Sequence, residues 1–227
     1  AVRGGKTYRA RVRHMDSTGR WSHWSAPIEF VAADPLATAH QQGLVISEIM
    51  YNPTGPDDVE YVELRNIGPT PLDLTNVRFT KGIDFDFVPG TVVASRDYLL
   101  VVRNQRAFQF RYGDGLPIAG EWDSDDRLDN GGENLRLSFG AGIPIVEFRY
   151  GDNQPWPEGA DGDGFSLTLD VASTAQPGDH QDPAAWRVSR FPGGSPGTDD
   201  GIVFSSWALA SGLADDADWN RDADGDG

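Results

Sequence analysis

Short runs of alternating apolar and polar residues fill most of this 227-residue chain. At the start, KTYRARVRHM (residues 6–15) carries arginine at every second position from 9 to 13. A period of two places successive side chains on opposite faces, so this run predicts a β-strand. DSTGR (16–20) supplies turn residues, and WSHWSAPIEFVA (21–32) is typical of a returning strand. The first 31 residues therefore predict a β-hairpin, in which arginine guanidinium groups would lie over tryptophan rings.

Nine further apolar or alternating runs follow at intervals of about eight to twelve residues, as in an all-β sandwich. They are 44–51, 59–66, 72–80, 83–88, 91–102, 133–139, 144–150, 165–170 and 186–189. The 27 glycines and 15 prolines fall mostly between such runs, where turns are needed. The pattern thus predicts an all-β fold.

Two segments show helical spacing instead. RNQRAFQFRYG (103–113) has Asn104 as an N-cap and Gly113 as a stop, which predicts a short helix between strands. IVFSSWALASG (202–212) predicts a second short helix near the C-terminus. Residues 32–43 have no periodicity and are interpreted as a linker.

Charge and composition exclude several classes of function. The net charge of −16 disfavours binding to nucleic acid or to an anionic membrane surface, and makes cations the better ligands. The apolar run YLLVV is far shorter than the ~20 residues that span a bilayer, so no membrane insertion is expected. No cysteine is present, so disulfides and thiolate metal sites are excluded. No phosphate-binding glycine motif, catalytic triad pattern or HExxH occurs.

The hairpin sequence TYRARVRHMDSTGRWSHWSAPIEF resembles the last two strands of a fibronectin type III domain. Tyr8 stands at the place of the tyrosine corner, and WSHWS matches the WSXWS box of some members of that family. The resemblance implies that residues 1–31 are the C-terminal part of such a domain, whose earlier strands would lie outside this chain. A structural role for the stacked Trp and Arg side chains is favoured over a receptor function.

Residues 44–198 resemble the lamin tail domain, an immunoglobulin-like sandwich found in nuclear lamins and in many bacterial secreted proteins. The matching pieces come in the expected order and are LVISEIMYNP, EYVELRNIG, PLDLTNVRF, FVPGTVVASRDYLLVVRN, RLDNGGENLRLSFGAG, FRYGDNQPWPEGADGDGFSLTL, Trp186 and GGSPGT. Lamin tails that contact nucleic acid do so through a basic surface, whereas this sequence is strongly acidic.

The resemblances imply a non-catalytic, extracellular or cell-surface module of a larger bacterial protein, with cell-surface or matrix components, including polysaccharide, as partners. The order of hairpin and lamin tail domain is similar to the C-terminal part of spore-coat-H-type kinase family surface proteins. Any enzymatic activity is then expected upstream of these residues.

Residues 199–227 resemble the junction in planctomycete-like surface proteins at which a short helix leads into a calcium-binding Asp/Gly repeat. Asp222, Asp224 and Asp226, followed by Gly227, fit the first half of D-x-[DN]-x-[DN]-G. Alternate carboxylates supply three of the six to eight oxygen ligands that Ca²⁺ requires. The remaining ligands of this motif would lie past Gly227, so the sequence predicts part of a Ca²⁺ site.

The same pentapeptide, ADGDG, also occurs at 160–164 between a proline-bearing loop and a strand. No third aspartate follows at the required spacing, so a structural turn is favoured there over a metal site. The acidic loop EWDSDDRLDNGGE (121–133) is a further candidate cation site, although a solvated loop is favoured.

Two alternatives to a non-catalytic module remain, and both make the sandwich itself the functional domain. Glu48, Glu60 and Glu63 could serve as a hydrolytic acid and base, but their alternation with apolar residues is typical of a strand's solvent face. Trp122 and Trp156 lie beside acidic, Gly/Pro-rich loops, where exposed indoles would stack on sugar.

Overall fold

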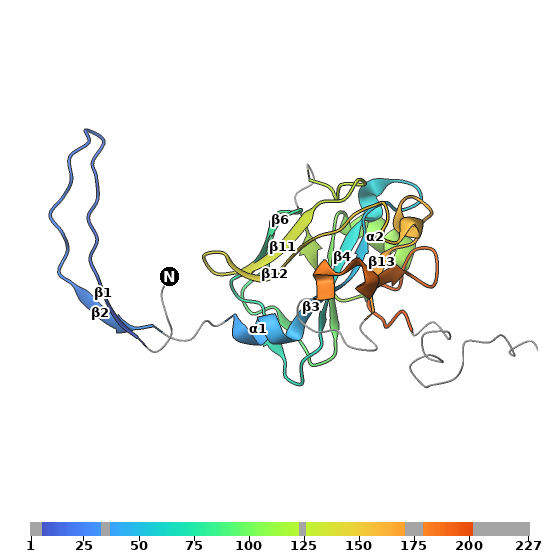
Figure 1. Cartoon of the computed structure of the whole chain (residues 1–227), viewed down its shortest axis with the longest axis horizontal. Helices are drawn as coiled ribbons and strands as arrows, with labels where there is room; N and C mark the ends of the chain where they lie inside the picture. The colour runs from blue at the N-terminus through green and yellow to red at the C-terminus, as the bar shows by residue number, and fades with distance from the viewer. Residues whose placement is uncertain (1–5, 33–36, 123–125, 171–178, 202–227) are drawn as a thin grey trace, which may run out of the picture. The chain divides into compact units, whose positions relative to one another are not determined.

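The computed structural model describes residues 6–32, 37–122, 126–170 and 179–201, which fall into two compact units, 1–38 and 39–227 (Figure 1). The second predicted helix, together with Asp222, Asp224 and Asp226, lies outside the described residues.

The N-terminal unit is the predicted hairpin. Its strands are β1 (Thr7–Ala10) and β2 (Ile28–Val31), which pair antiparallel, and a bridge joins Met15 to Trp21 further out. Arg13 lies over the rings of Trp21 and Trp24, at 4.2 and 4.7 Å from their centroids. The predicted cation–π contacts are therefore confirmed.

The serines of WSHWS join the two arms of the hairpin where regular pairing is interrupted. Ser25 Oγ accepts a hydrogen bond from the Val12 amide, and Ser22 Oγ accepts one from the His14 amide, each at 3.1 Å. The two serine amides donate back to the carbonyls of the same residues. Each serine thus replaces a rung of the β-ladder, which gives the motif a structural role.

The second unit is an immunoglobulin-like β-sandwich. Its larger sheet has six strands in the order β10-β9-β4-β3-β13-β14. These strands are β10 (Ile118–Glu121), β9 (Tyr98–Val102), β4 (Tyr61–Asn66), β3 (Leu44–Met50), β13 (Leu167–Leu169) and β14 (Trp186–Val188). All neighbouring pairs are antiparallel except β10 with β9.

A second sheet has four strands in the order β12-β11-β6-β7, and a small sheet pairs β5 with β8. These strands are β12 (Ile143–Arg149), β11 (Asn134–Phe139), β6 (Val77–Lys81), β7 (Phe85–Asp86), β5 (Leu72–Asp73) and β8 (Val92–Val93). The main core lies between the sheets and includes Ile46, Leu64, Phe79, Leu137 and Phe148.

Helices occupy the connections. They are α1 (Thr38–Gly43), α2 (Gln105–Tyr112) and four 3₁₀ turns, η1 (Asp57–Val59), η2 (Glu158–Ala160), η3 (Asp179–Gln181) and η4 (Pro183–Ala185). Among the residues that the structure describes, none of these helices has the length and apolar character of a membrane span.

Helix α2 confirms the predicted helix and both of its ends. The Asn104 side chain accepts a hydrogen bond from the Ala107 amide at 2.9 Å, and Gly113 ends the helix with a φ of 87°. Phe108 is fully buried with Met50, Tyr61, Leu100 and Val102 in a second, smaller core. Because these partners come from β3, β4 and β9, α2 covers part of the outer face of the six-stranded sheet.

Three local features differ from the sequence prediction. Residues 38–43, predicted as linker, form α1, in which His40 and Gly43 are buried. The runs 72–80 and 91–102 are each split into two strands, because Asn76 and Arg96 adopt positive φ (65° and 69°) and turn the chain. Strand β10 was not predicted; it adds parallel to β9 after α2.

Candidate functional site

A pair of buried glutamates lies on the two central strands of the larger sheet. Glu48 of β3 and Glu63 of β4 stand directly opposite each other in the antiparallel register. The register shifts between Ile46 and Glu48, so that Ser47 forms an irregularity beside the pair. This shift brings both carboxylates to the same, outward face of the sheet.

That face is not exposed to solvent, and the prediction that Glu48, Glu60 and Glu63 lie on an open strand face was wrong. Glu48 and Glu63 are each 1% exposed and Glu60 is 0% exposed. The alternation correctly places Glu48 and Glu63 away from the main core. The covering layer comes from α2 and from residues 191–201, which we call the closing segment, and strand periodicity does not identify which distant segment covers a face.

Hydroxyl and amide groups surround the Glu48 carboxylate. Its Oε1 accepts hydrogen bonds from Tyr61 Oη at 2.7 Å, from the Ser195 amide at 2.9 Å and from Ser166 Oγ. Its Oε2 accepts one from Ser195 Oγ at 3.3 Å. Four donors from β4, from the residue before β13 and from the closing segment thus converge on one side chain, which favours its ionised form.

Glu63 has fewer donors. Ser47 Oγ donates to its Oε1 and the Gly197 amide donates to its Oε2, each at 2.6 Å. Ser47 Oγ also lies 3.4 Å from the Glu63 carbonyl, so this hydroxyl can donate there instead and accept a proton from the carboxyl group. The site can therefore hold Glu63 in its neutral form without losing a hydrogen bond.

The pKa directions agree with these surroundings. Burial, followed by the charge of Glu48, raises the pKa of Glu63 to about 8. Burial also raises the pKa of Glu48, although its hydrogen bonds from Ser166, Ser195 and Tyr61 oppose the shift. Two buried carboxylates this close favour keeping a proton between them, and Glu63, which has fewer donors, is the better site for it.

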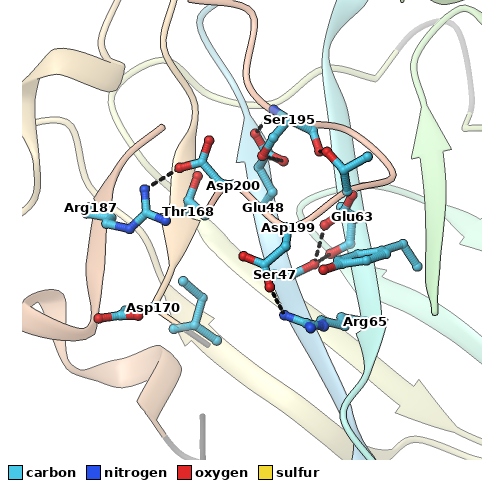
Figure 2. A pocket seen from close by; sticks show the side chains of 13 residues that line it. Ser47, Glu48, Glu63, Arg65, Thr168, Asp170, Arg187, Ser195, Asp199 and Asp200 are labelled. Carbon is cyan, nitrogen blue, oxygen red and sulfur yellow. Dashed lines mark hydrogen bonds and ion pairs between the residues drawn. The ribbon is translucent and has the colours of Figure 1, made fainter. Parts of the chain in front are cut away.

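Two ion pairs border the glutamates and hold the end of the closing segment, as Figure 2 shows. Arg65 of β4 pairs with Asp199 at 3.2 Å, and Arg187 of β14 pairs with Asp200. Asp200 also accepts the Arg190 amide at 3.0 Å. The segment is thus fixed to the sheet by charge at one end and by the glutamate pair in its middle.

The space between these groups is about 20 Å³, enough for about one water molecule. A sugar ring does not fit there, and the donors of the closing segment already occupy the carboxylate oxygens. Glu60 lies apart: its carboxylate accepts the Leu128 amide at 3.1 Å and pairs with Arg103 at 3.3 Å. The three glutamates therefore do not form a substrate cleft of the kind that glycoside hydrolysis requires.

A model of the Lamin Tail Domain family matches residues 37–152 of this fold, from α1 past the end of β12. The chain belongs to this family. No curated protein and no solved structure matches the sequence. The lamin tail domain is an immunoglobulin-like, non-enzymatic family, consistent with the filled interior around Glu48 and Glu63. The closing segment lies beyond the matched range.

Trp122 is not available as a sugar platform in this lamin tail domain. Its side chain is 3% exposed, and its indole N–H donates to the Asp126 carbonyl at 3.2 Å. Trp156 is half-buried, with its ring 6.0 Å from that of Trp186 and its edge against Gly151. The prediction of exposed indoles was therefore wrong for Trp122, because its ring fills the core.

The described acids of the 121–133 loop accept hydrogen bonds from other groups of the protein. Asp126 accepts the Asp84 amide, and Glu133 accepts the Asp129 amide and the Tyr150 hydroxyl. Within the described ranges, no group of three or more acidic, histidine or cysteine side chains is placed to hold a metal ion. Residues 123–125 of this loop lie outside those ranges.

The inner ADGDG copy forms a turn, as predicted. Gly162 and Gly164 both have positive φ, and Asp161 accepts a hydrogen bond from the Asn52 side chain at 2.7 Å. The Gly164 carbonyl also accepts a hydrogen bond from the Gly193 amide at 2.6 Å. This turn thus supports the closing segment, a role that the sequence did not indicate.

Sequence reasoning identified the glutamates but missed what covers them. One signal was present: LVISEIMY is apolar at nearly every position, which is typical of a strand buried on both faces. GGSPGT (193–198) contains three glycines and one proline, and this composition allows the close backbone approach found here.

Proposed function

We propose that this chain is a non-catalytic, extracellular structural and adhesion module of a larger bacterial secreted or cell-surface protein. The observation that carries the proposal is the closed glutamate pair. The only closely paired buried carboxylates among the described residues use their oxygens to fasten the chain's own closing segment. A site that binds its own backbone in this way stabilises the domain rather than turning over a substrate.

The position of the closing segment along the chain also supports the proposal. The amides of Ser195 and Gly197, which follow β14 in the chain, donate hydrogen bonds to Glu48 and Glu63. The closing segment is therefore held against the sandwich. A chain that leaves the domain at a fixed place suits a domain within a longer array of domains. Cell-surface or matrix components, polysaccharides among them, are the partners that we propose for such an array.

The location and the adhesive role are tested together on intact cells of the encoding bacterium. Antibodies raised against the purified chain should label unpermeabilised cells, and beads coated with the chain should bind isolated cell-surface or matrix material. Beads coated with a heat-unfolded sample provide the control. Labelling only after permeabilisation would contradict the extracellular location, and equal binding by both bead samples would contradict the adhesive role.

We further propose that residues 1–31 are the end of a fibronectin type III domain. The support is an exposed apolar surface of a kind that soluble proteins normally cover. The exposed side chains are Val12, Met15, Trp21, Trp24, Ile28, Phe30 and Val31. A longer protein that also contains the earlier strands of such a domain should protect the amides of this hairpin from hydrogen exchange more strongly than residues 1–227 alone do. Equal protection in both would contradict the assignment.

Calcium binding is proposed for Asp222, Asp224 and Asp226 together with ligands from residues past Gly227. Their spacing of two is the support, because it presents alternate carboxylates to one ion. In the parent protein, millimolar Ca²⁺ should raise the unfolding temperature, since the ion binds the folded state alone. Replacing the three aspartates by asparagine should remove most of that rise. An unchanged melting curve with Ca²⁺ would exclude the site.

A further inference from the structure

A broad apolar groove lies on the surface of the sandwich beside α2, away from the glutamate pair. It measures about 800 Å³ and lies between α2 and the segment that enters η1. Its apolar lining comes from Pro56, Val59, Ala107 and Phe110, and its charged lining includes Arg106 and Arg111. We call this surface the α2 groove.

Phe110 is the unusual residue of the α2 groove. Its side chain is 95% exposed, although Phe108 and Tyr112 on the same helix pack against the sheet. The positions at i and i+4 share one helix face, so the residue at i+2 points to the opposite side. The fold does not need a phenylalanine there, and a large aromatic side chain fully in water is typical of a contact surface.

The charge of the groove differs from that of the chain as a whole. The net charge is −16, yet Arg106 and Arg111 flank Phe110, and Asp114 is the one acidic residue of the lining. Neither arginine forms an ion pair with a carboxylate in the described part of the chain. Arg111 donates to the Thr54 carbonyl at 3.0 Å, which holds it at the rim of the groove.

We propose that the α2 groove binds an acidic peptide segment of a partner protein, which inserts an apolar side chain beside Phe110 while its carboxylates pair with Arg106 and Arg111. The apolar lining requires an apolar group from the ligand, and the two arginines select for carboxylates near it. An acidic polysaccharide supplies carboxylates but not the apolar group. The inference rests on the proposed function only in treating the domain as an interaction module.

The probe is a fluorescein-labelled synthetic peptide with aspartates and glutamates around a central Leu-Trp pair, titrated with the full chain and followed by fluorescence anisotropy. Saturable binding is expected. Phe110→Ala should weaken it by about ten-fold, since that is the loss caused by removing about 1.4 kcal/mol of contact energy. The double variant Arg106→Glu/Arg111→Glu should weaken it at least as strongly and reduce its salt dependence.

The chain offers matched controls. Phe191 is 59% exposed and stacks with Arg190 outside the groove, and Arg149 is an exposed arginine of β12. Phe191→Ala and Arg149→Glu should leave peptide binding unchanged. Every variant replaces an exposed side chain. Phe110→Ala, Phe191→Ala and Arg149→Glu should keep the melting temperature of the unaltered chain, whereas Arg106→Glu/Arg111→Glu also loses the Arg111–Thr54 hydrogen bond, so its melting curve is measured to separate loss of binding from loss of fold.

Several results would overturn the proposal. These are equal binding of a peptide with lysines in place of the acids, equal binding of one with alanines in place of Leu-Trp, or no saturable binding at millimolar peptide. Self-association of the chain that Phe110→Ala abolishes would assign the groove to a second copy instead. The titration uses purified protein, so its outcome is independent of the cell-labelling experiment.

Discussion

At Gly194 the closing segment passes so close to the glutamate pair that no side chain fits. A Cβ there would overlap Tyr61 Oη and Glu48 Oε1, and the residue has a φ of +80°. Glycine therefore meets two demands at once, a left-handed backbone and a close approach. A single residue, Gly194, thus links the backbone conformation of the closing segment to its close approach to the charged glutamate pair.

Replacing Gly194 by alanine should destabilise the domain by about 2–4 kcal/mol, because the strained φ and the steric overlap both contribute. Gly90→Ala is the matched control, since Gly90 has nearly the same φ (+86°) with open space around it. That control should cost only about 1 kcal/mol. Urea denaturation of both variants measures the difference, and equal losses would show that the close approach contributes nothing.

Glu63 should make the stability depend on pH. Its pKa is raised from 4.5 to about 8, so the folded state holds a proton that the unfolded chain has released. The resulting stabilisation is complete below about pH 4.5 and is lost as the pH rises to about 8. Glu63→Gln mimics the protonated form, because its amide can donate to Ser47 Oγ while its oxygen accepts the Gly197 amide.

We therefore expect Glu63→Gln to flatten the fall in unfolding free energy between pH 5 and 8, by on the order of a few kcal/mol. Glu60, whose pKa burial raises to about 7, contributes a fall of the same sign that remains in the variant. Denaturation curves at several pH values measure the effect, with the exposed Glu158→Gln as control. A variant curve parallel to that of the unaltered protein would show that Glu63 is ionised throughout.

Among the elements, α2 shows where local signals suffice. Asn104, Gly113 and the buried Phe108 specify its start, its end and its packed face, and all three could be recognised in the sequence. The outward direction of Phe110 follows from the same spacing. Helix α1 shows the opposite case: TAHQQG has almost no apolar periodicity, and it forms because His40 and Gly43 are buried against the sandwich.

Removing the cap of α2 should lower stability measurably. Asn104→Ala deletes the acceptor of the Ala107 amide and should cost about 1 kcal/mol, whereas Asn104→Asp keeps an acceptor and should cost less. Thermal unfolding of the two variants tests this. A loss as large in the aspartate variant as in the alanine variant would mean that the hydrogen bond is not the source of the effect.

On the scale of the whole molecule, the chain consists of two units, each held together by its own contacts. The described core residues of the sandwich begin at Leu44, so none comes from the hairpin. The hairpin is held by backbone pairing, by its two serine rungs and by Arg13 between two indoles. A two-stranded hairpin of this kind is marginally stable by itself.

Deleting residues 1–36 should consequently leave the main unfolding transition of the sandwich within a few degrees of its original temperature. Differential scanning calorimetry of the intact and shortened chains provides the measurement. A large drop in the transition temperature would mean that the sandwich depends on contacts with the hairpin.

The sequence by itself determined the all-β class, most strands and helix α2, because these depend on periodicity, turn residues and caps that act over a few positions. The lamin tail domain was indicated by a resemblance of motifs in order along the chain, and the family match confirms it. Only the tertiary structure decided that Glu48 and Glu63 are buried, that Trp122 lies in the core, and that Phe110 borders an apolar groove. Burial of an outward strand face depends on which distant segment covers it, and Gly197 of the closing segment lies 134 positions from Glu63. No local pattern records a contact over that separation.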